Sequence, residues 1–131
     1  MVNQKVKEKL DTYRKAISRL EDILNEEISN DYIYDAVIRR FEFTYEVAWK
    51  LMKLTLEYKG IVEARSPRDV FREAFAVGII KNGDVWFKML TDRNLTSHTY
   101  DQETAIAIYH RIKDDYFETL NLLIEQIERS L

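Results

Sequence analysis

The chain has 131 residues, of which 46% are hydrophobic and 33% charged, with three glycines, one proline and a formal charge of −3. This length fits one domain, residues 1–131, and the composition favours packed helices over disorder. The acidic balance argues against a general nucleic-acid-binding surface but leaves room for a local basic cleft, and the lack of cysteine excludes disulfides, thiolate metal sites and cysteine nucleophiles.

The N-terminal segment predicts a long amphipathic helix. Charged residues occupy one face and interrupt any apolar h-region of a signal peptide, and no later stretch approaches the ~20 apolar residues of a membrane span. We therefore expect a cytoplasmic protein. The apolar stripe of this helix, at spacings of three and four residues, consists of Val6, Leu10, Tyr13, Ile17, Leu20, Leu24 and Ile28.

A second long helix is predicted between Asn30 or Asp31, either of which can cap its start, and Gly60, which suits the position after its end. This helix is apolar on two sides, so we expect it to be central or to serve both the core and a subunit interface. One side carries Val37, Phe41, Thr44, Ala48, Leu51 and Thr55, and the other carries Phe43, Val47, Leu54 and Tyr58.

Two short helices should follow. The sequence SPRD at 66–69 places a capping serine, a proline and an acid at the positions that begin a helix, and Gly78 should end it. Asn82-Gly83 is a turn signal, and Asp84 is the expected cap of the second short helix, which leads into DRNLTSHTY at 92–100.

Asp101 should cap a long last helix, whose apolar residues keep the helical period as far as Ile127. Three long and two short helices predict an all-α fold. The simplest arrangement is an antiparallel four-helix-type bundle with an extra short helix.

Most other conspicuous residues have structural explanations. His110 and Asp114 could form one edge of a metal site, but no HExxH or ExxH pairing accompanies them, and no glycine-rich phosphate loop is present. We therefore predict no metal and no cofactor. Packing in the core or at an interface is the expected role of Phe41, Phe43, Trp49 and Trp86.

Arg93 and His98 combine a permanent planar cation with a base that titrates near neutral pH. Such a pair suffices for metal-free RNA cleavage, in which a base deprotonates the ribose 2′-hydroxyl and a cation stabilises the phosphorane. On a straight helix the two side chains would lie about 140° apart. The helix must therefore end between them, as Thr96 and Ser97 suggest, or a second subunit must complete the site. On spacing alone, a capping arginine and a hydrogen-bonded histidine explain the pair more simply.

Four motifs in order resemble the nucleotidyltransferase substrate-binding protein family, the HepT-like branch of the HEPN superfamily. They are RFEFTYEVAWK (40–50), SPRDVFREAFAVGII (66–80), the tryptophan after NGD, and DRNLTSHTYD (92–101). The resemblance spans nearly the whole chain. It implies an antiparallel helical bundle that forms a homodimer and binds a minimal nucleotidyltransferase encoded beside it.

The last motif carries the functional signature of that family. Arg93, Asn94 and His98 match its R-x4–6-H pattern, and by position Tyr100 is the tyrosine to which the partner enzyme attaches AMP. Two such sets in a dimer would concentrate positive charge that the acidic average conceals. Asp92 is expected to orient Arg93 or balance its charge, and Asn94 to bind a phosphate or brace the loop.

The resemblance thus implies the toxin of a HEPN/MNT toxin–antitoxin pair. Its catalytic residues would be Arg93 and His98 of a metal-independent endoribonuclease acting on RNA, and AMP transfer to Tyr100 would silence it. The alternative is a non-catalytic substrate-binding or regulatory subunit of a nucleotidyltransferase, in which the same loop is a docking surface.

Overall fold

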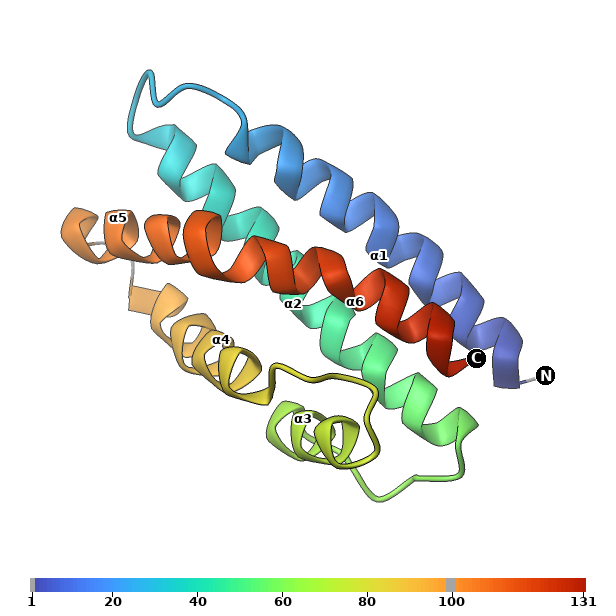
Figure 1. The fold of residues 1–131 in the computed structure, drawn as a ribbon. Helices are drawn as coiled ribbons and strands as arrows, with labels where there is room; N and C mark the ends of the chain where they lie inside the picture. The colour runs from blue at the N-terminus through green and yellow to red at the C-terminus, as the bar shows by residue number, and fades with distance from the viewer. Residues whose placement is uncertain (1, 99–100) are drawn as a thin grey trace.

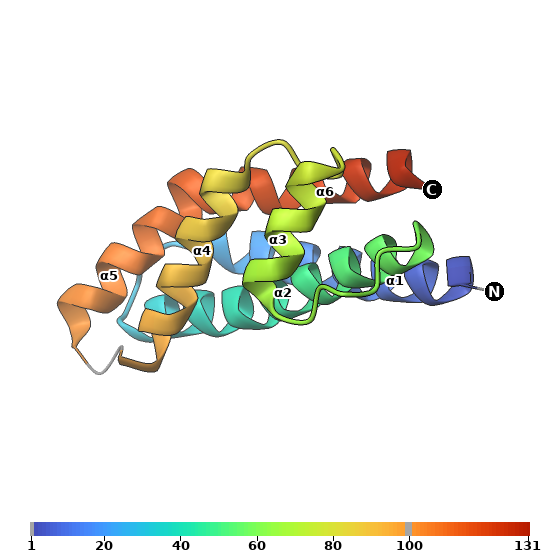
Figure 2. The ribbon, with the colours of Figure 1, turned by 90° about the horizontal axis from the view of Figure 1, so that it is seen from below.

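The computed structural model describes residues 2–98 and 101–131, and the predicted all-α, four-helix-type bundle with an extra short helix is confirmed (Figure 1). The helices α1 and α2 form an antiparallel hairpin, α3 and α4 lie along one side, and α5 and α6 return across the bundle (Figure 2). The α-helices are α1 (Val2–Leu24), α2 (Tyr32–Tyr58), α3 (Pro67–Ala76), α4 (Gly83–Leu95), α5 (Gln102–Arg111) and α6 (Phe117–Ser130).

The first helix follows the predicted stripe but ends earlier. Ile28, expected on the stripe, lies beyond Leu24 in the loop and is 41% exposed. The reason is the polar run after Leu24, whose asparagines and serine favour turns over helix. Asn30 supplies the side-chain bond at the start of α2 by accepting from the Tyr32 N–H at 2.9 Å, whereas Asp31 makes no such bond.

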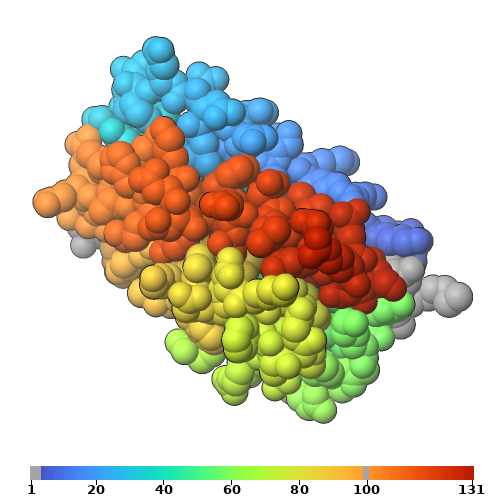
Figure 3. Space-filling model, in the orientation of Figure 1, coloured from blue at the N-terminus to red at the C-terminus, as the bar shows by residue number. Residues whose placement is uncertain are grey.

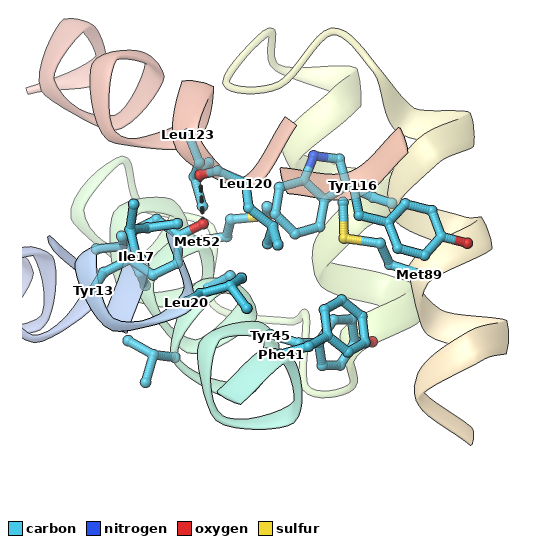
Figure 4. Close-up of a cluster of buried hydrophobic side chains, with 14 of the residues drawn as sticks. Tyr13, Ile17, Leu20, Phe41, Tyr45, Met52, Met89, Tyr116, Leu120 and Leu123 are labelled. Carbon is cyan, nitrogen blue, oxygen red and sulfur yellow. Dashed lines mark hydrogen bonds between the residues drawn. The ribbon is translucent and has the colours of Figure 1, made fainter. Parts of the chain in front are cut away.

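The second helix is central, as predicted. Its first apolar side is buried, and α1, α5–α6 and α3–α4 together leave little of α2 visible from the side of α6 (Figure 3). In the core, Phe41 stacks on Tyr116 at a centroid distance of 5.9 Å, and the Tyr13 hydroxyl donates to the Leu120 carbonyl at 2.6 Å (Figure 4). The second side is only partly covered, since Phe43 stays 55% exposed.

The first short helix, α3, begins and ends at the predicted residues. The Ser66 hydroxyl accepts from the Asp69 N–H at 3.3 Å, and Gly78 ends α3 with a φ of +82°. The predicted cap of α4 was wrong: Asn82 precedes the helix, and Asp84 lies in its first turn. The helix starts at Gly83 because the Asn82 carbonyl accepts from the Val85 and Trp86 N–H groups at 3.1 and 3.3 Å, and Gly83 itself packs against the Phe75 ring, where an added Cβ would come within 3.2 Å.

The last helix starts at its predicted cap, because Asp101 accepts from the Glu103 N–H at 3.2 Å. It runs from α5 into α6 through a π-helical turn, Ile112–Tyr116. Such a turn changes the register of side chains within a continuous helix. Within the described part of the chain, no helix is both long and apolar enough to cross a membrane.

Candidate functional site

The helix α4 ends between Arg93 and His98, as the spacing requires. Its last residue is Leu95, and a 3₁₀ turn, Thr96–His98, follows. The end of a helix leaves carbonyl groups without partners, and short hydroxyl side chains can bond to them. The Thr96 hydroxyl donates to the Arg93 carbonyl at 2.6 Å, and the Ser97 hydroxyl donates to the Asn94 carbonyl at 3.0 Å. The hydroxyl residues that make the stretch unusual therefore stop the helix.

Arg93 is held by two carboxylates of α2. Its Nη1 lies 3.1 Å from Glu42 Oε2, and its Nε lies 3.6 Å from Glu46 Oε1. Nη1 also donates to the Thr96 hydroxyl at 3.0 Å, and that hydroxyl lies 2.9 Å from Glu42 Oε2. Glu46 is itself positioned by Trp49, whose indole N–H donates to Oε2 at 2.9 Å. The last turn of α4 is thereby joined to the middle of α2.

The pairing of Arg93 is incomplete. Its side chain is 30% exposed, and within the described residues its Nη2 donates no hydrogen bond, while the buried Nε lies too far from Glu46 to make one. A guanidinium has five N–H donors in a fixed fork. Arg93 is therefore anchored yet keeps donor capacity for an anion. Burial and Glu46 raise the pKa of the neighbouring Tyr45, while Arg93 opposes that rise, so this phenol stays protonated.

Asp92 turns away from Arg93 and into the bundle. Its carboxylate accepts from Arg111 through Nε at 2.6 Å and Nη2 at 2.9 Å, and from the Tyr116 hydroxyl at 2.5 Å. Burial and the bond to Asp92 raise the pKa of Tyr116, and the same carboxylate raises the pKa of Arg111. Asp92 thus ties α4 to α5 and the π turn, and the carboxylates that contact Arg93 are Glu42 and Glu46 instead.

The remaining predicted site residues lie on the surface or outside the described chain. His98 is exposed in the 3₁₀ turn that follows α4. Asn94 is also exposed, and its side chain makes no hydrogen bond to the described residues. Tyr100 lies outside the described residues. An exposed imidazole three residues beyond the end of a helix that holds a fixed guanidinium can exchange protons beside a bound anion.

The residues that position this region could not be assigned from spacing in the chain. Glu42 and Glu46 are one helical turn apart, which places both on one face of α2, but nothing local indicates that this face meets α4. Arg111 and Tyr116 both reach Asp92 because the π turn, Ile112–Tyr116, directly follows Arg111 and brings side chains five residues apart toward the same side. The described residues contain no group of three or more histidine, aspartate or glutamate side chains arranged to hold a metal ion.

Comparison with known proteins adds a consistent set of relatives. The family model described as "Nucleotidyltransferase substrate binding protein like" matches residues 8–129. A Haemophilus influenzae protein named "Probable ribonuclease HepT" is 38% identical over 106 residues, which are 78% of this chain and 72% of the relative.

Solved structures share the fold. A Haemophilus influenzae structure, described as the fold of a substrate-binding domain of a nucleotidyltransferase, has 33% identity and a TM-score of 0.80 over 91% of this chain and 98% of its own. A Thermus thermophilus structure has 33% identity and a TM-score of 0.75, covering 90% of this chain and 98% of its own. A toxin–antitoxin MntA–HepT mutant has 19% identity and a TM-score of 0.80, covering 95% and 97%, and shows the shared fold alone.

Proposed function

Because the chain belongs to the nucleotidyltransferase substrate-binding protein family, in its HepT-like branch, we propose that it is the ribonuclease toxin of a toxin–antitoxin pair. The observation that carries the proposal is the arrangement at the end of α4. Arg93 is anchored by carboxylates with part of its fork open, and the exposed His98 follows in the next turn. The name of the 38% identical relative, a probable ribonuclease, supports the same activity.

The proposed reaction is internal transfer of a phosphodiester. His98 takes the proton of the ribose 2′-hydroxyl, and the 2′-oxygen attacks the adjacent phosphorus. The bond to the 5′-oxygen of the next nucleotide breaks, and that oxygen leaves with a proton returned by the protonated His98. Arg93 binds the non-bridging oxygens, whose charge grows in the phosphorane. The products are a 2′,3′-cyclic phosphate and a 5′-hydroxyl, and no metal ion takes part.

Silencing is proposed to occur at Tyr100 through a minimal nucleotidyltransferase partner. The phenol oxygen attacks the α-phosphate of ATP, pyrophosphate leaves, and a base of the partner takes the phenol proton. A phenol with an ordinary pKa near ~10 needs such a base. The attached AMP places a phosphodiester two residues from His98, where it competes with RNA for Arg93.

A homodimer is the proposed working form. A twofold axis would bring two sets of Arg93 and His98 to one cleft. Each Arg93 lies against Glu42 and Glu46, so a second Arg93 and His98 would add donors and a proton carrier for the same RNA phosphate.

The second candidate function is a non-catalytic substrate-binding or regulatory subunit of a nucleotidyltransferase. The description of the matching family favours it. In that case Arg93 would bind the partner or its nucleotide, and neither the wild type nor any variant would cleave RNA.

The test is cleavage of a mixed RNA pool in EDTA by the purified protein freed of AMP. The wild type should generate 2′,3′-cyclic phosphate ends, and His98→Ala should reduce the rate by about 10²- to 10⁴-fold. His110→Ala is the matched control, because His110 is the other histidine of the chain and is also exposed. If wild type and His98→Ala are equally inactive on every RNA and equally harmless in cells, the ribonuclease proposal fails.

The silencing step has its own measurement, the intact mass after incubation with the partner and ATP. Whole AMP increments should appear on the wild type and be absent from Tyr100→Phe. Tyr32→Phe should leave them unchanged, since Tyr32 is a 79% exposed tyrosine on α2. AMP increments that persist in Tyr100→Phe would show that another residue is modified.

A further inference from the structure

A groove with a concentrated positive charge lies between α1 and α2, outside the residues assigned to cleavage. It has a volume of about 430 Å³, and four of the side chains that line it are basic and none acidic. Its lining consists of Thr12, Lys15, Ala16, Arg19, Arg39, Arg40 and Phe43. In a chain of net charge −3, this concentration of cations without acids sets the groove apart.

Within the described residues, the cations of the groove are not neutralised by ion pairs. In the described part of the chain, Lys15, Arg19 and Arg39 form no ion pair and are exposed. Arg40 donates from Nη1 to the Arg19 carbonyl at 2.7 Å, which fixes its guanidinium against α1. Some arginines elsewhere on the surface do form ion pairs, such as Arg14 with Glu128 at 2.7 Å. Positive charges held close together without counterions suit a polyanion.

The rim of the groove also carries an exposed aromatic ring. Phe43 is 55% exposed, and its ring borders the aliphatic floor formed by Ala16 and the stems of the basic side chains. Proteins that bind single-stranded nucleic acid combine a basic groove for the backbone with aromatic rings on which bases stack. An acidic protein surface would explain the cations but not the exposed ring among them.

The groove is close to the end of α4 because α2 contributes to both. Glu42, which pairs with Arg93, precedes Phe43, so the two side chains leave α2 about 100° apart. From Arg39 to Glu46 the helix rises about 10 Å, a length that a few nucleotides of a strand can span. A strand lying in the groove can therefore reach Arg93.

We propose that the groove between α1 and α2 binds the phosphodiester backbone of a single-stranded RNA, with Lys15, Arg19, Arg39 and Arg40 contacting phosphates and Phe43 stacking on a base. The inference rests on the proposed ribonuclease function for its choice of RNA. It adds a substrate-binding surface, separate from Arg93 and His98, that holds the strand whose scissile phosphate lies at the end of α4.

The experiment measures RNA binding without cleavage. In the full-length His98→Ala protein, the affinity for a labelled single-stranded RNA of about a dozen nucleotides is followed by fluorescence anisotropy across a salt series. Adding Lys15→Ala and Arg39→Ala should weaken binding about 25-fold at ~0.1 M salt and make the slope of log K against log salt less steep by about 1.4. Lys7→Ala with Lys88→Ala is the matched control, because both lysines are exposed and lie outside the groove.

Phe43 has a control of equal exposure. Phe43→Ala should weaken binding about tenfold with an unchanged salt slope, and Phe75→Ala, also 55% exposed, should have no effect. If the groove pair and the control pair weaken binding equally, the groove has no special role. If the groove pair leaves RNA binding unchanged and instead weakens self-association in sedimentation, the groove is a contact between subunits.

Failure of this inference is separable from failure of the proposed function. Binding that depends on the groove, in a protein that never cuts RNA, would support the groove and reject the ribonuclease. With His98 restored and cleavage present, the groove pair should raise KM and leave kcat within about twofold. Cleavage with an unchanged KM would support the ribonuclease and overturn the groove.

Discussion

Neighbouring residues at the end of α4 form two arginine–carboxylate clusters with opposite properties. Asp92 is 7% exposed, and its two oxygens accept three hydrogen bonds, two from Arg111 and one from Tyr116. Arg93 is 30% exposed and is held by single contacts at 3.1 and 3.6 Å to Glu42 and Glu46. The first, the closed cluster, consists of Asp92, Arg111 and Tyr116; its hydrogen bonds are satisfied internally and connect helices. The second, the open cluster, consists of Arg93, Glu42 and Glu46 and leaves donors of the guanidinium unused. The difference distinguishes a structural ion pair from the proposed anion site.

The largest expected effect concerns the open cluster. Arg93→Ala should lower kcat for RNA cleavage by about 10²- to 10³-fold, because one preorganised charge-stabilising donor is lost. The melting temperature should change little, since a partly exposed pair contributes little to stability. The measurements are single-turnover cleavage and thermal unfolding.

Arg93→Lys sharpens the same test, because lysine keeps the charge and loses the planar fork. Its activity should lie between those of the wild type and Arg93→Ala. Arg72→Ala, which removes an exposed arginine paired with Asp69, should retain full activity. An Arg93→Ala protein that melts at a much lower temperature yet cleaves normally while folded would reverse the assignment of the two clusters.

The closed cluster should respond in the opposite way. Asp92→Ala should lower the free energy of unfolding by about 3 kcal/mol, near the lower limit for a broken buried pair, because the freed Arg111 is 39% exposed and can reach water. Urea unfolding measures this change. Asp11→Ala breaks an exposed pair with Arg14 and should cost under about 1 kcal/mol. Equal losses in the two variants would remove the distinction between the clusters.

Much of the fold follows from local patterns, whereas the two clusters do not. The stripe of α1 and the caps at Ser66 and Asp101 depend on residues close in sequence, and the structure confirms them. The start of α4 departs from the pattern, because the Asn82 carbonyl accepts the first backbone bonds of the helix. Contacts between distant segments, such as Arg93 with Glu42 and Glu46, leave no local pattern.

In the candidate site, too, local features were predictable from the sequence and contacts between distant segments were not. The end of the helix between Arg93 and His98 was predictable from Thr96 and Ser97, since hydroxyl residues disfavour helix interiors. The charge partner of Arg93 was not, because an adjacent acid such as Asp92 is the natural local choice. The π turn places Tyr116 beside Asp92 instead, and it leaves no simple pattern in the sequence.

Alkaline pH should weaken the closed cluster. Burial and the bond to Asp92 raise the pKa of Tyr116 above ~10, so its contribution to stability is complete below about pH 10 and falls as the pH rises toward the folded-state value. Burial also raises the pKa of Tyr13 and Tyr45. Above about pH 10, each of these three tyrosines should lower the free energy of unfolding by about 1.4 kcal/mol per pH unit.

Tyr116→Phe isolates one of these contributions. It should cost about 1.5 kcal/mol at neutral pH, for a hydrogen bond to a charged group, and reduce the alkaline slope by about a third. Urea unfolding from about pH 9 to about pH 11 measures both quantities. Tyr32→Phe, at a 79% exposed position, should change neither. An unchanged alkaline slope in Tyr116→Phe would mean that this phenol does not couple to folding.

The smallest expected effect lies in the carboxylates that hold Arg93. Glu46→Gln keeps the shape and the bond from Trp49 but removes one negative charge beside the guanidinium. Because the pair is partly exposed, stability should change by less than about 1 kcal/mol. The potential at Arg93 becomes more positive, so RNA should bind about two- to fivefold more tightly, with a steeper salt dependence. Glu57→Gln removes the same charge from the end of α2 and should leave binding unchanged. Weaker binding in Glu46→Gln would show that the carboxylate acts by positioning Arg93 rather than by moderating its charge.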